Sequence, residues 1–101
     1  MWLLVMFDLP VLTKTERREA SRFRENLMEF GFERCQFSVY LRFCEGKEQI
    51  QTAIRRVQVV LPKGGLVYSL CFTDKQYEQI LRFDRRKPLP SPKNPEQYQL
   101  F

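Results

Sequence analysis

The chain opens with a run of hydrophobic residues that stops at a carboxylate. Residues 1–7 are all apolar, Asp8 follows them, and Pro10 stands shortly after. A continuous apolar run of this length is typical of a strand that is buried on both faces. Since proline cannot donate to a strand ladder, the strand should end at or near Asp8. A carboxylate at the end of a buried strand is a candidate for chemistry, although aspartate also favours simple turns.

Two later stretches carry hydrophobic residues at helical spacing. The first predicts a helix over 14–30, which begins with a capping box at Thr13 and Glu16 and ends at Gly31. The second predicts a helix that begins at Gly46-Lys47 and ends before 62–65. The two apolar stripes consist of Ala20, Phe23, Leu27 and Phe30 in the first helix, and of Ile50, Ala53, Ile54, Val57 and Leu61 in the second.

The remaining apolar segments favour strands. Alternation over 37–43 predicts a strand that buries Phe37, Val39 and Leu41, while 33–36 form either a separate strand or part of one bent, bulged strand. Residues 66–72 read as a buried strand, 73–80 as a short helix with a second capping box, and 81–83 as a last short strand.

The order of these elements predicts an α+β, ferredoxin-like βαββαβ sandwich with an extra short C-terminal strand. Both helical stripes would cover one face of an antiparallel sheet. The first and fourth strands are apolar on both faces, so the other face also needs a cover. A second copy of the same sheet is the simplest cover, which predicts a homodimer with two-fold symmetry.

Length and composition predict one nucleic-acid-binding domain over 1–86 and a Pro-rich tail over 87–101. The chain has no histidine, which excludes a histidine-dependent triad and argues strongly against a zinc site. Cys35, Cys44 and Cys71 contain no CxxC pair and suggest buried, reduced side chains. With no signal-like start and no apolar run long enough to span a membrane, the sequence predicts a cytoplasmic protein without a membrane partner.

Arginine dominates the net charge of +5. The planar guanidinium group of arginine presents several hydrogen-bond donors that match phosphate oxygens. The composition therefore favours a protein that binds nucleic acid. Interleaved glutamates on the first helix leave open the alternative of a salt-bridged surface helix. The candidate nucleic-acid-binding residues are Arg17, Arg18, Arg22, Arg55, Arg56, Arg85 and Arg86.

The tail combines several prolines with an apolar tip. Residues 87–96 predict an extended linker. Apolar side chains at the tip of a polar tail favour a partner-docking peptide, with a loose chain end as the alternative. The proposed docking residues are Tyr98, Leu100 and Phe101.

Several of these pieces together resemble the Cas2 family, small CRISPR-associated proteins that work beside the integrase in spacer acquisition. They are the apolar strand that ends at Asp8, the first helix with Arg17 and Arg18, Gly31, the segment Gln36-Phe37-Ser38-Val39-Tyr40, and Thr73-Asp74-Lys75-Gln76. The resemblance covers most of residues 1–84. It implies a ferredoxin-like homodimer that lies against duplex DNA and bridges integrase subunits, and a metal-dependent endonuclease activity on RNA or DNA.

The same resemblance places Asp8 at the family's metal-ligand position, with a catalytic role. A single aspartate is a poor cage for Mg²⁺ or Mn²⁺, so two copies of Asp8 across the dimer axis are expected to share the ion. Three alternatives remain open at this point: a non-catalytic adaptor, a toxin-like endoribonuclease of the same fold without a CRISPR role, and a regulatory ferredoxin-like dimer.

Overall fold

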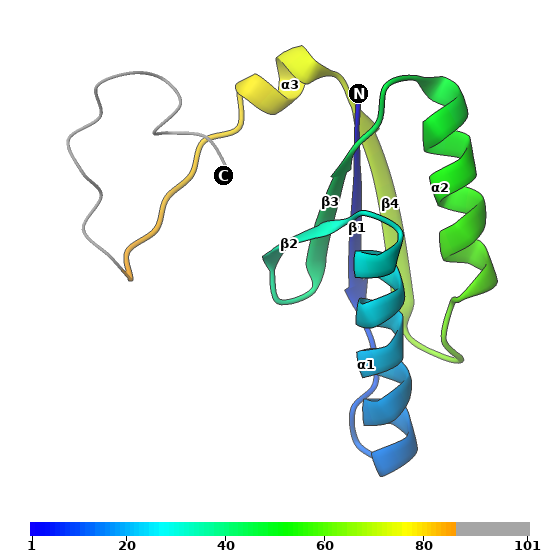
Figure 1. The fold of residues 1–101 in the computed structure, drawn as a ribbon. Coiled ribbons are helices and arrows are strands. Elements are labelled where there is room, and N and C mark those ends of the chain that lie inside the picture. Colours follow the sequence, from blue (N-terminus) through cyan, green and yellow to red (C-terminus); the bar gives the residue numbers. More distant parts are fainter. Residues whose placement is uncertain (87–101) are drawn as a thin grey trace.

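The computed structural model describes residues 1–86 and contains an antiparallel sheet with two long helices on one face (Figure 1). The strands are β1 (Trp2–Asp8), β2 (Glu33–Gln36), β3 (Val39–Phe43) and β4 (Leu66–Phe72). The helices are α1 (Lys14–Glu29), α2 (Lys47–Val59) and the short α3 (Asp74–Glu78). The sheet has the order β2-β3-β1-β4. Element order and sheet together confirm the predicted ferredoxin-like fold.

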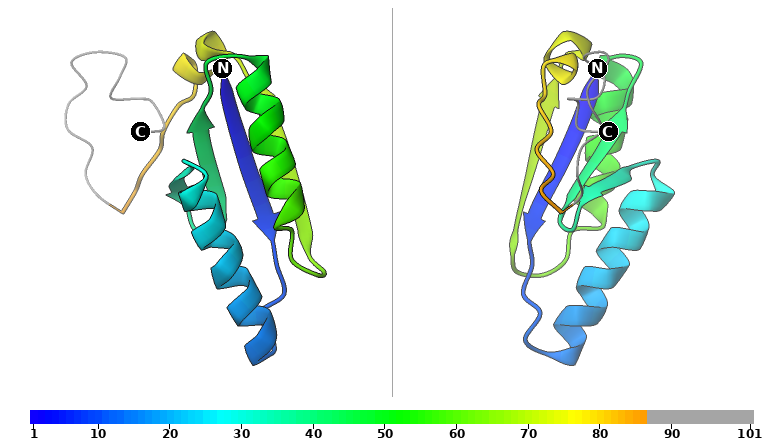
Figure 2. Two further views of the ribbon diagram at one scale, coloured as in Figure 1. Left: turned by 45° about the vertical axis from the view of Figure 1, so that its right-hand side comes forward. Right: turned by 90° about the vertical axis from the view of Figure 1, so that its left-hand side faces the viewer.

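The core lies between the sheet and the two long helices (Figure 2). Every second residue of β1 points toward α1 and α2, so the strand is buried on that side. The helices contribute most of their predicted stripes, but Leu61 follows the end of α2 and is 47% exposed. The main core side chains are Leu3, Val5 and Phe7 from β1, Ala20, Phe23 and Leu27 from α1, and Ile50, Ala53 and Val57 from α2.

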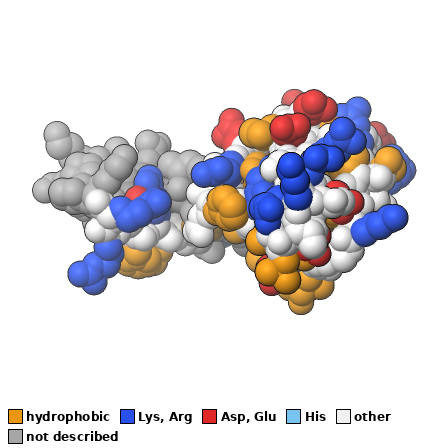
Figure 3. Space-filling view, turned by 90° about the horizontal axis from the view of Figure 1, so that it is seen from below, with side chains coloured by type: hydrophobic (Ala, Val, Ile, Leu, Met, Phe, Trp, Pro, Cys, Tyr) orange, Lys and Arg blue, Asp and Glu red, His pale blue; other side chains and the backbone are white. Residues whose placement is uncertain are grey.

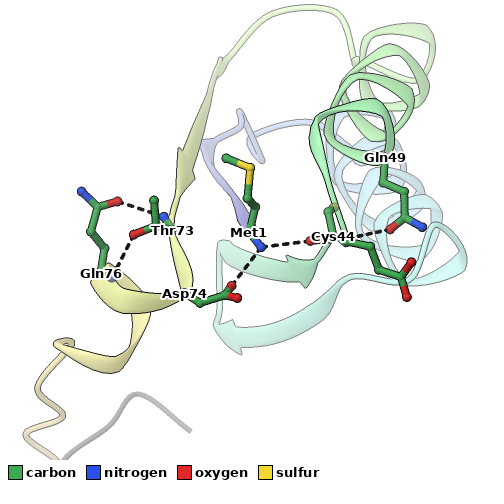
Figure 4. Close-up of polar contacts among 7 residues, drawn as sticks. Met1, Cys44, Gln49, Thr73, Asp74 and Gln76 are labelled. Atoms are coloured by element: carbon green, nitrogen blue, oxygen red, sulfur yellow. Dashed lines mark hydrogen bonds and ion pairs between the residues drawn. The ribbon is translucent and has the colours of Figure 1, made fainter.

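Both predicted capping boxes are present. The Thr13 hydroxyl accepts from the Glu16 amide at 3.0 Å, and the Thr13 amide donates to the Glu16 carboxylate at 2.8 Å. Thr73 and Gln76 make the same reciprocal pair at the start of α3 (Figure 4). Such caps contribute about 1 kcal/mol each to helix stability. At the other end of α1, Gly31 adopts a φ of +89°, which glycine accepts without strain.

β2 and β3 are separate strands, with a bulge between Arg34 and Gln36 and a turn at residues 37–38. The predicted burial of Phe37 is wrong, because the side chain lies in this turn and is 65% exposed. The turn also shifts the alternation that follows. Tyr40 therefore faces the helices and stacks near Phe7, with ring centroids 5.8 Å apart.

The opposite face of the sheet is partly bare. Met6 is 38% exposed, and Leu66, Tyr68 and Leu70 of β4 are 53–55% exposed. Strand pairing places these four residues on one side, because Met6 lies opposite Tyr68 and Leu70 lies opposite Leu4. We call Met6, Leu66, Tyr68 and Leu70 the uncovered face. The sequence predicted that β1 and β4 are buried on both faces. In a single chain this prediction is wrong, because the uncovered face of both strands is exposed.

α3 covers only the end of the sheet where β1 begins. The Trp2 and Tyr77 rings stack there, with centroids 4.0 Å apart. The Met1 amino group donates to the Cys44 carbonyl at 3.0 Å and pairs with the Asp74 carboxylate at 2.9 Å (Figure 4). These contacts join the start of β1 to the end of β3 and to α3.

Residues 80–86 run outside the sheet, on the side away from α2 (Figure 2). The short strand predicted over 81–83 does not form, because this segment has no neighbouring strand with which to exchange hydrogen bonds. Leu81 and Phe83 are 61% and 81% exposed. Within residues 1–86, no helix has the length and hydrophobicity needed to cross a membrane.

Candidate functional site

Asp8 ends β1 on the same side of the sheet as the uncovered face. Alternation along β1 buries Phe7 among the helices and turns Asp8 outward, opposite Leu66 of β4. The Asp8 side chain is exposed and makes no hydrogen bond or ion pair with any residue in 1–86. Its carboxylate oxygens are therefore free to bind a cation.

The donor set in one chain is too small to enclose a metal ion. Among residues 1–86 there is no group of three acidic, cysteine or histidine side chains close enough to hold one. Mg²⁺ is commonly bound through one or two carboxylates, with water and phosphate oxygens as the other ligands. Asp8 fits this pattern as one ligand, and the position of its carboxylate beside the uncovered face allows a second copy to supply another.

The loop between α2 and β4 passes directly over the backbone of this site. Gly65 has a φ of +79°, and a Cβ placed on it would lie 2.8 Å from the Asp8 carbonyl oxygen and 2.8 Å from Cδ2 of Leu9. Only glycine allows this approach without displacing the strand end. Gly64 also has a positive φ, but a Cβ there would only touch Pro10 at 3.8 Å.

Arg17 is the predicted phosphate ligand that lies closest in sequence to Asp8. Its Nη1 donates to the carbonyl oxygens of Val11 and Leu12, at 3.1 Å each. The guanidinium therefore holds the loop between β1 and α1 and keeps its other nitrogens for a ligand. Its role in nucleic-acid binding stays a prediction.

The other predicted arginines occupy separate surfaces. Arg18 and Arg22 are exposed on α1, and Arg55 and Arg56 are exposed on α2. Arg55 bonds the Thr52 hydroxyl at 3.4 Å. Viewed from the end where β1 stops, Lys and Arg side chains form a band beside hydrophobic patches (Figure 3).

Arg85 and Arg86 lie in the extended segment after α3. Arg86 binds the carboxylate of Asp84 through Nε and Nη2, both at 3.0 Å, and Arg82 adds a third contact at 3.2 Å. The hydrogen bonds from Arg86 hold the pKa of Asp84 well below its usual range. Arg86 is thus engaged with Asp84, whereas Arg85 is exposed and makes no such contact with residues 1–86.

Sequence reasoning missed a cluster around the turn between β2 and β3. The guanidinium carbon of Arg24 lies over the Phe7 ring at 5.5 Å and over the Phe37 ring at 4.4 Å. Arg34 approaches the Phe37 ring at 5.8 Å. The only signal in the sequence was that Arg24 falls beside the apolar stripe of α1; nothing local placed Phe37 next to it.

All three cysteines are free thiols. Cys44 is buried, Cys35 is half-buried, and Cys71 is exposed, so the predicted burial fails for Cys71, which lies on the edge strand β4. Burial raises the pKa of the Cys35 and Cys44 thiols, which keeps them neutral near pH 7.

The linker over 87–96 and the proposed docking residues Tyr98, Leu100 and Phe101 lie outside the described residues.

Comparison with known proteins agrees with this fold. Residues 1–80 match the family described as "CRISPR associated protein Cas2". The chain is 52% identical over its full length to a "CRISPR-associated endoribonuclease Cas2" of Paracidovorax avenae, of which it covers 94%. It is 40% identical to proteins of the same name from Flavobacterium psychrophilum and Parvibaculum lavamentivorans, again over its full length and over 88% and 100% of theirs. On the strength of these matches, this chain belongs to the Cas2 family of CRISPR-associated proteins.

Proposed function

We propose that this chain works as a homodimer in CRISPR spacer acquisition and cleaves phosphodiester bonds with a divalent metal ion held by Asp8. The observation that carries the proposal is the position of Asp8, an unpaired carboxylate at the edge of a bare apolar face. Membership of the Cas2 family and the name endoribonuclease carried by its relatives support the CRISPR role and the cleavage activity.

The uncovered face supports a homodimer. Hydrophobic patches of this kind on a small domain commonly mark an interaction surface. The exposed Leu81 and Phe83 give the extended segment 80–86 a second apolar surface for the same partner to cover. A two-fold axis near the end of β1 would bring both Asp8 carboxylates together.

The paired carboxylates account for the expected chemistry. Two like charges in proximity repel each other, and a cation between them relieves that repulsion. When bound there, Mg²⁺ or Mn²⁺ supplies an activated water and polarises the scissile phosphate. Asp8 would then act as a ligand that fixes the ion at the strand end, while arginines exposed elsewhere on the surface would hold the backbone phosphates of the bound nucleic acid.

The test compares metal-dependent cleavage of RNA and DNA by the intact chain and by Asp8→Ala. The proposal is supported if the variant loses cleavage but remains folded and keeps the oligomeric state of the intact chain, because only the metal ligand has then been removed. Glu25→Gln removes a carboxylate that is exposed on α1 and serves as the matched control. Equal cleavage by Asp8→Ala and by the intact chain would show that the activity does not depend on this site.

An adaptor role belongs to the same proposal. The exposed arginines of α1 and α2 and the basic segment around Arg85 would grip the backbone of duplex DNA, and the tail with Tyr98, Leu100 and Phe101 would hold the integrase. An adaptor without catalysis would keep its DNA and integrase binding after Asp8→Ala, so the same variant separates the two activities. Family membership favours this CRISPR role over a toxin-like endoribonuclease of the same fold.

A further inference from the structure

One arginine of β3 points to the side of the sheet that the two long helices cover. Arg42 lies opposite Leu3 of β1, and side chains that face each other across neighbouring strands share one side of a sheet. Leu3 is buried in the core, so the Arg42 side chain starts from the core side as well. Because an unpaired charge is costly to bury, the side chain extends to the surface beside α2, where it is half-buried.

Arg42 lines a hollow of about 240 Å³ at this surface. We call it the helix-side hollow, and its lining consists of Arg42, Glu48, Gln49, Thr52 and Arg56. Two arginines and one glutamate leave the lining with a net charge of +1. Sites that enclose a whole drug-sized molecule usually have about 300–1,000 Å³. The helix-side hollow is smaller, so a compact anionic group fits it better than an entire nucleotide.

Packing contacts hold both guanidinium groups near the end of α1. A Cβ placed on Gly31 would lie 3.4 Å from Nε of Arg42, so this side chain lies against the chain where α1 ends. Cζ of Arg56 lies 5.8 Å from the centre of the Phe30 ring, which belongs to the C-terminal cap of α1. The last turn of α1 has no basic residue, and the carbonyl end of a helix attracts cations. These contacts position the two arginines without occupying their hydrogen-bond donors.

The donors around the hollow are free to bind a ligand. Neither the Arg42 nor the Arg56 guanidinium makes a hydrogen bond or an ion pair with any residue in 1–86. Oε1 of Gln49 accepts from a backbone amide at 3.0 Å, which leaves its NH₂ group as a donor (Figure 4). The Thr52 hydroxyl accepts a hydrogen bond at 3.4 Å and keeps its own proton to donate. Two guanidinium groups and two neutral donors therefore line one small hollow.

The carboxylate of Glu48 does not neutralise this pair of arginines. Glu48 lies in the first turn of α2, where a negative charge is favourable for the helix. Its side chain makes no ion pair with any residue in 1–86. A phosphate monoester carries a charge of about −1.5 to −2 at pH 7, whereas a phosphodiester carries a single charge. Two unpaired guanidinium groups match the charge of the monoester better.

We propose that the helix-side hollow binds a phosphate monoester, with Arg42 and Arg56 as its charged ligands. Arginine binds phosphate oxygens through two parallel hydrogen bonds, which favours this group over a simple monovalent anion. A free nucleotide and the phosphorylated end of a nucleic acid both present a phosphate monoester. Because the hollow is too small to enclose a base, the phosphate is the part that it recognises.

The hollow is separate from the proposed metal site, so the inference goes beyond the proposed function. It lies on the helix side of the sheet, whereas Asp8 lies on the side of the uncovered face. Leu3, which marks its position on β1, precedes Asp8 by about 16 Å along the strand. A second copy on the uncovered face would leave both hollows of the dimer open.

The test follows the side-chain Nε–H signals of Arg42 and Arg56 by NMR while inorganic phosphate is added to the metal-free chain at constant ionic strength. Both signals should shift with one dissociation constant, because one ligand contacts both side chains. Arg42→Gln should weaken binding about ten-fold or more, the loss expected for a hydrogen bond between charged groups. Glu48→Gln should strengthen binding by about two-fold, because it removes the carboxylate of the hollow.

Control variants separate this site from general charge effects. Lys47→Gln removes a charge from α2 outside the hollow and should bind phosphate within about two-fold of the intact chain. Arg42→Lys keeps the charge but not the planar group, so it should lose less affinity than Arg42→Gln. Arg42 also packs against the end of α1, and thermal melts show whether its variants remain folded. Arg56→Gln, at an exposed position, should weaken phosphate binding in the same way without that risk.

The source of the phosphate is identified with three further ligands. These are adenosine 5′-monophosphate and one oligonucleotide sequence with either a 5′-phosphate or a 5′-hydroxyl. Binding of the monophosphate as tight as that of the phosphorylated oligonucleotide would support a nucleotide as the ligand. Tighter binding of the phosphorylated oligonucleotide than of the other two would support a nucleic-acid end.

Three results would overturn the inference. They are unshifted Arg42 and Arg56 signals in millimolar phosphate, undiminished phosphate binding by Arg42→Gln and Arg56→Gln, and binding of dimethyl phosphate, a diester, as tight as that of inorganic phosphate. None of them bears on cleavage at Asp8. Conversely, unchanged cleavage by Asp8→Ala would overturn the proposed metal site and leave the phosphate site standing.

Discussion

Truncation of Leu70 tests whether the uncovered face is a dimer interface. In a single chain Leu70 is 54% exposed, and it lies in the middle of β4, opposite Leu4. Full burial of a leucine side chain is worth about 1.5–3 kcal/mol, so covering the exposed half contributes about 0.8–1.6 kcal/mol per copy. A two-fold interface contains Leu70 twice, which gives about 1.6–3.2 kcal/mol per dimer.

Leu70→Ala should therefore raise the dimer dissociation constant by up to about 15- to 200-fold. The isolated chain should fold as before, because the deleted atoms are largely exposed in it. Sedimentation equilibrium over a range of concentrations measures the effect, and Val59→Ala on the far helical surface is the control. The reasoning is refuted if the intact chain sediments as a monomer at all concentrations, or if Leu70→Ala dimerises as tightly as the intact chain.

Two more predictions concern the strand end and the extended segment. Gly65→Ala should destabilise the fold by about 1–3 kcal/mol through its positive φ and also impair cleavage by displacing the Asp8 backbone. Gly64→Ala shares the positive φ but has room for a Cβ, so thermal melts should show a loss of stability without the loss of cleavage. The carboxyl of Asp84 should titrate by NMR below the ordinary aspartate value of about 3.9. The pKa of Asp84 is lowered in the folded chain. Its ionised carboxylate therefore stabilises the folded chain fully above the unfolded pKa, and this stabilisation is lost as the pH falls through the folded pKa. A normal midpoint for Asp84 would contradict the bonds to Arg86.

The features that the sequence predicted well depend on residues that are close along the chain. The capping box of Thr13 joins residues three positions apart, and the stripe of α1 repeats every three or four residues. Both signals were correct because the interactions they describe are local. The apolar runs of β1 and β4 predicted the two strands for the same reason, although the pairing of the strands joins residues far apart in the chain.

The features that the sequence did not predict depend on contacts between distant elements. The turn at Phe37 shifted the alternation of β3, and no local signal located that turn. Arg24 meets Phe37 only because α1 packs beside the end of the β2–β3 hairpin. Arg17 looked like a free phosphate ligand, but its side chain also holds the loop that precedes its own helix. The outward direction of Asp8, by contrast, follows directly from alternation along β1.

The central claim is that two chains together bind one metal ion through their Asp8 side chains. Calorimetric titration of the dimer with Mn²⁺ measures it most directly. We expect about one ion per two chains, with binding lost in Asp8→Asn and in a monomeric Leu70→Asp variant, because neither can present two carboxylates. One ion per chain, or binding that persists in the monomer or in Asp8→Asn, would contradict the account.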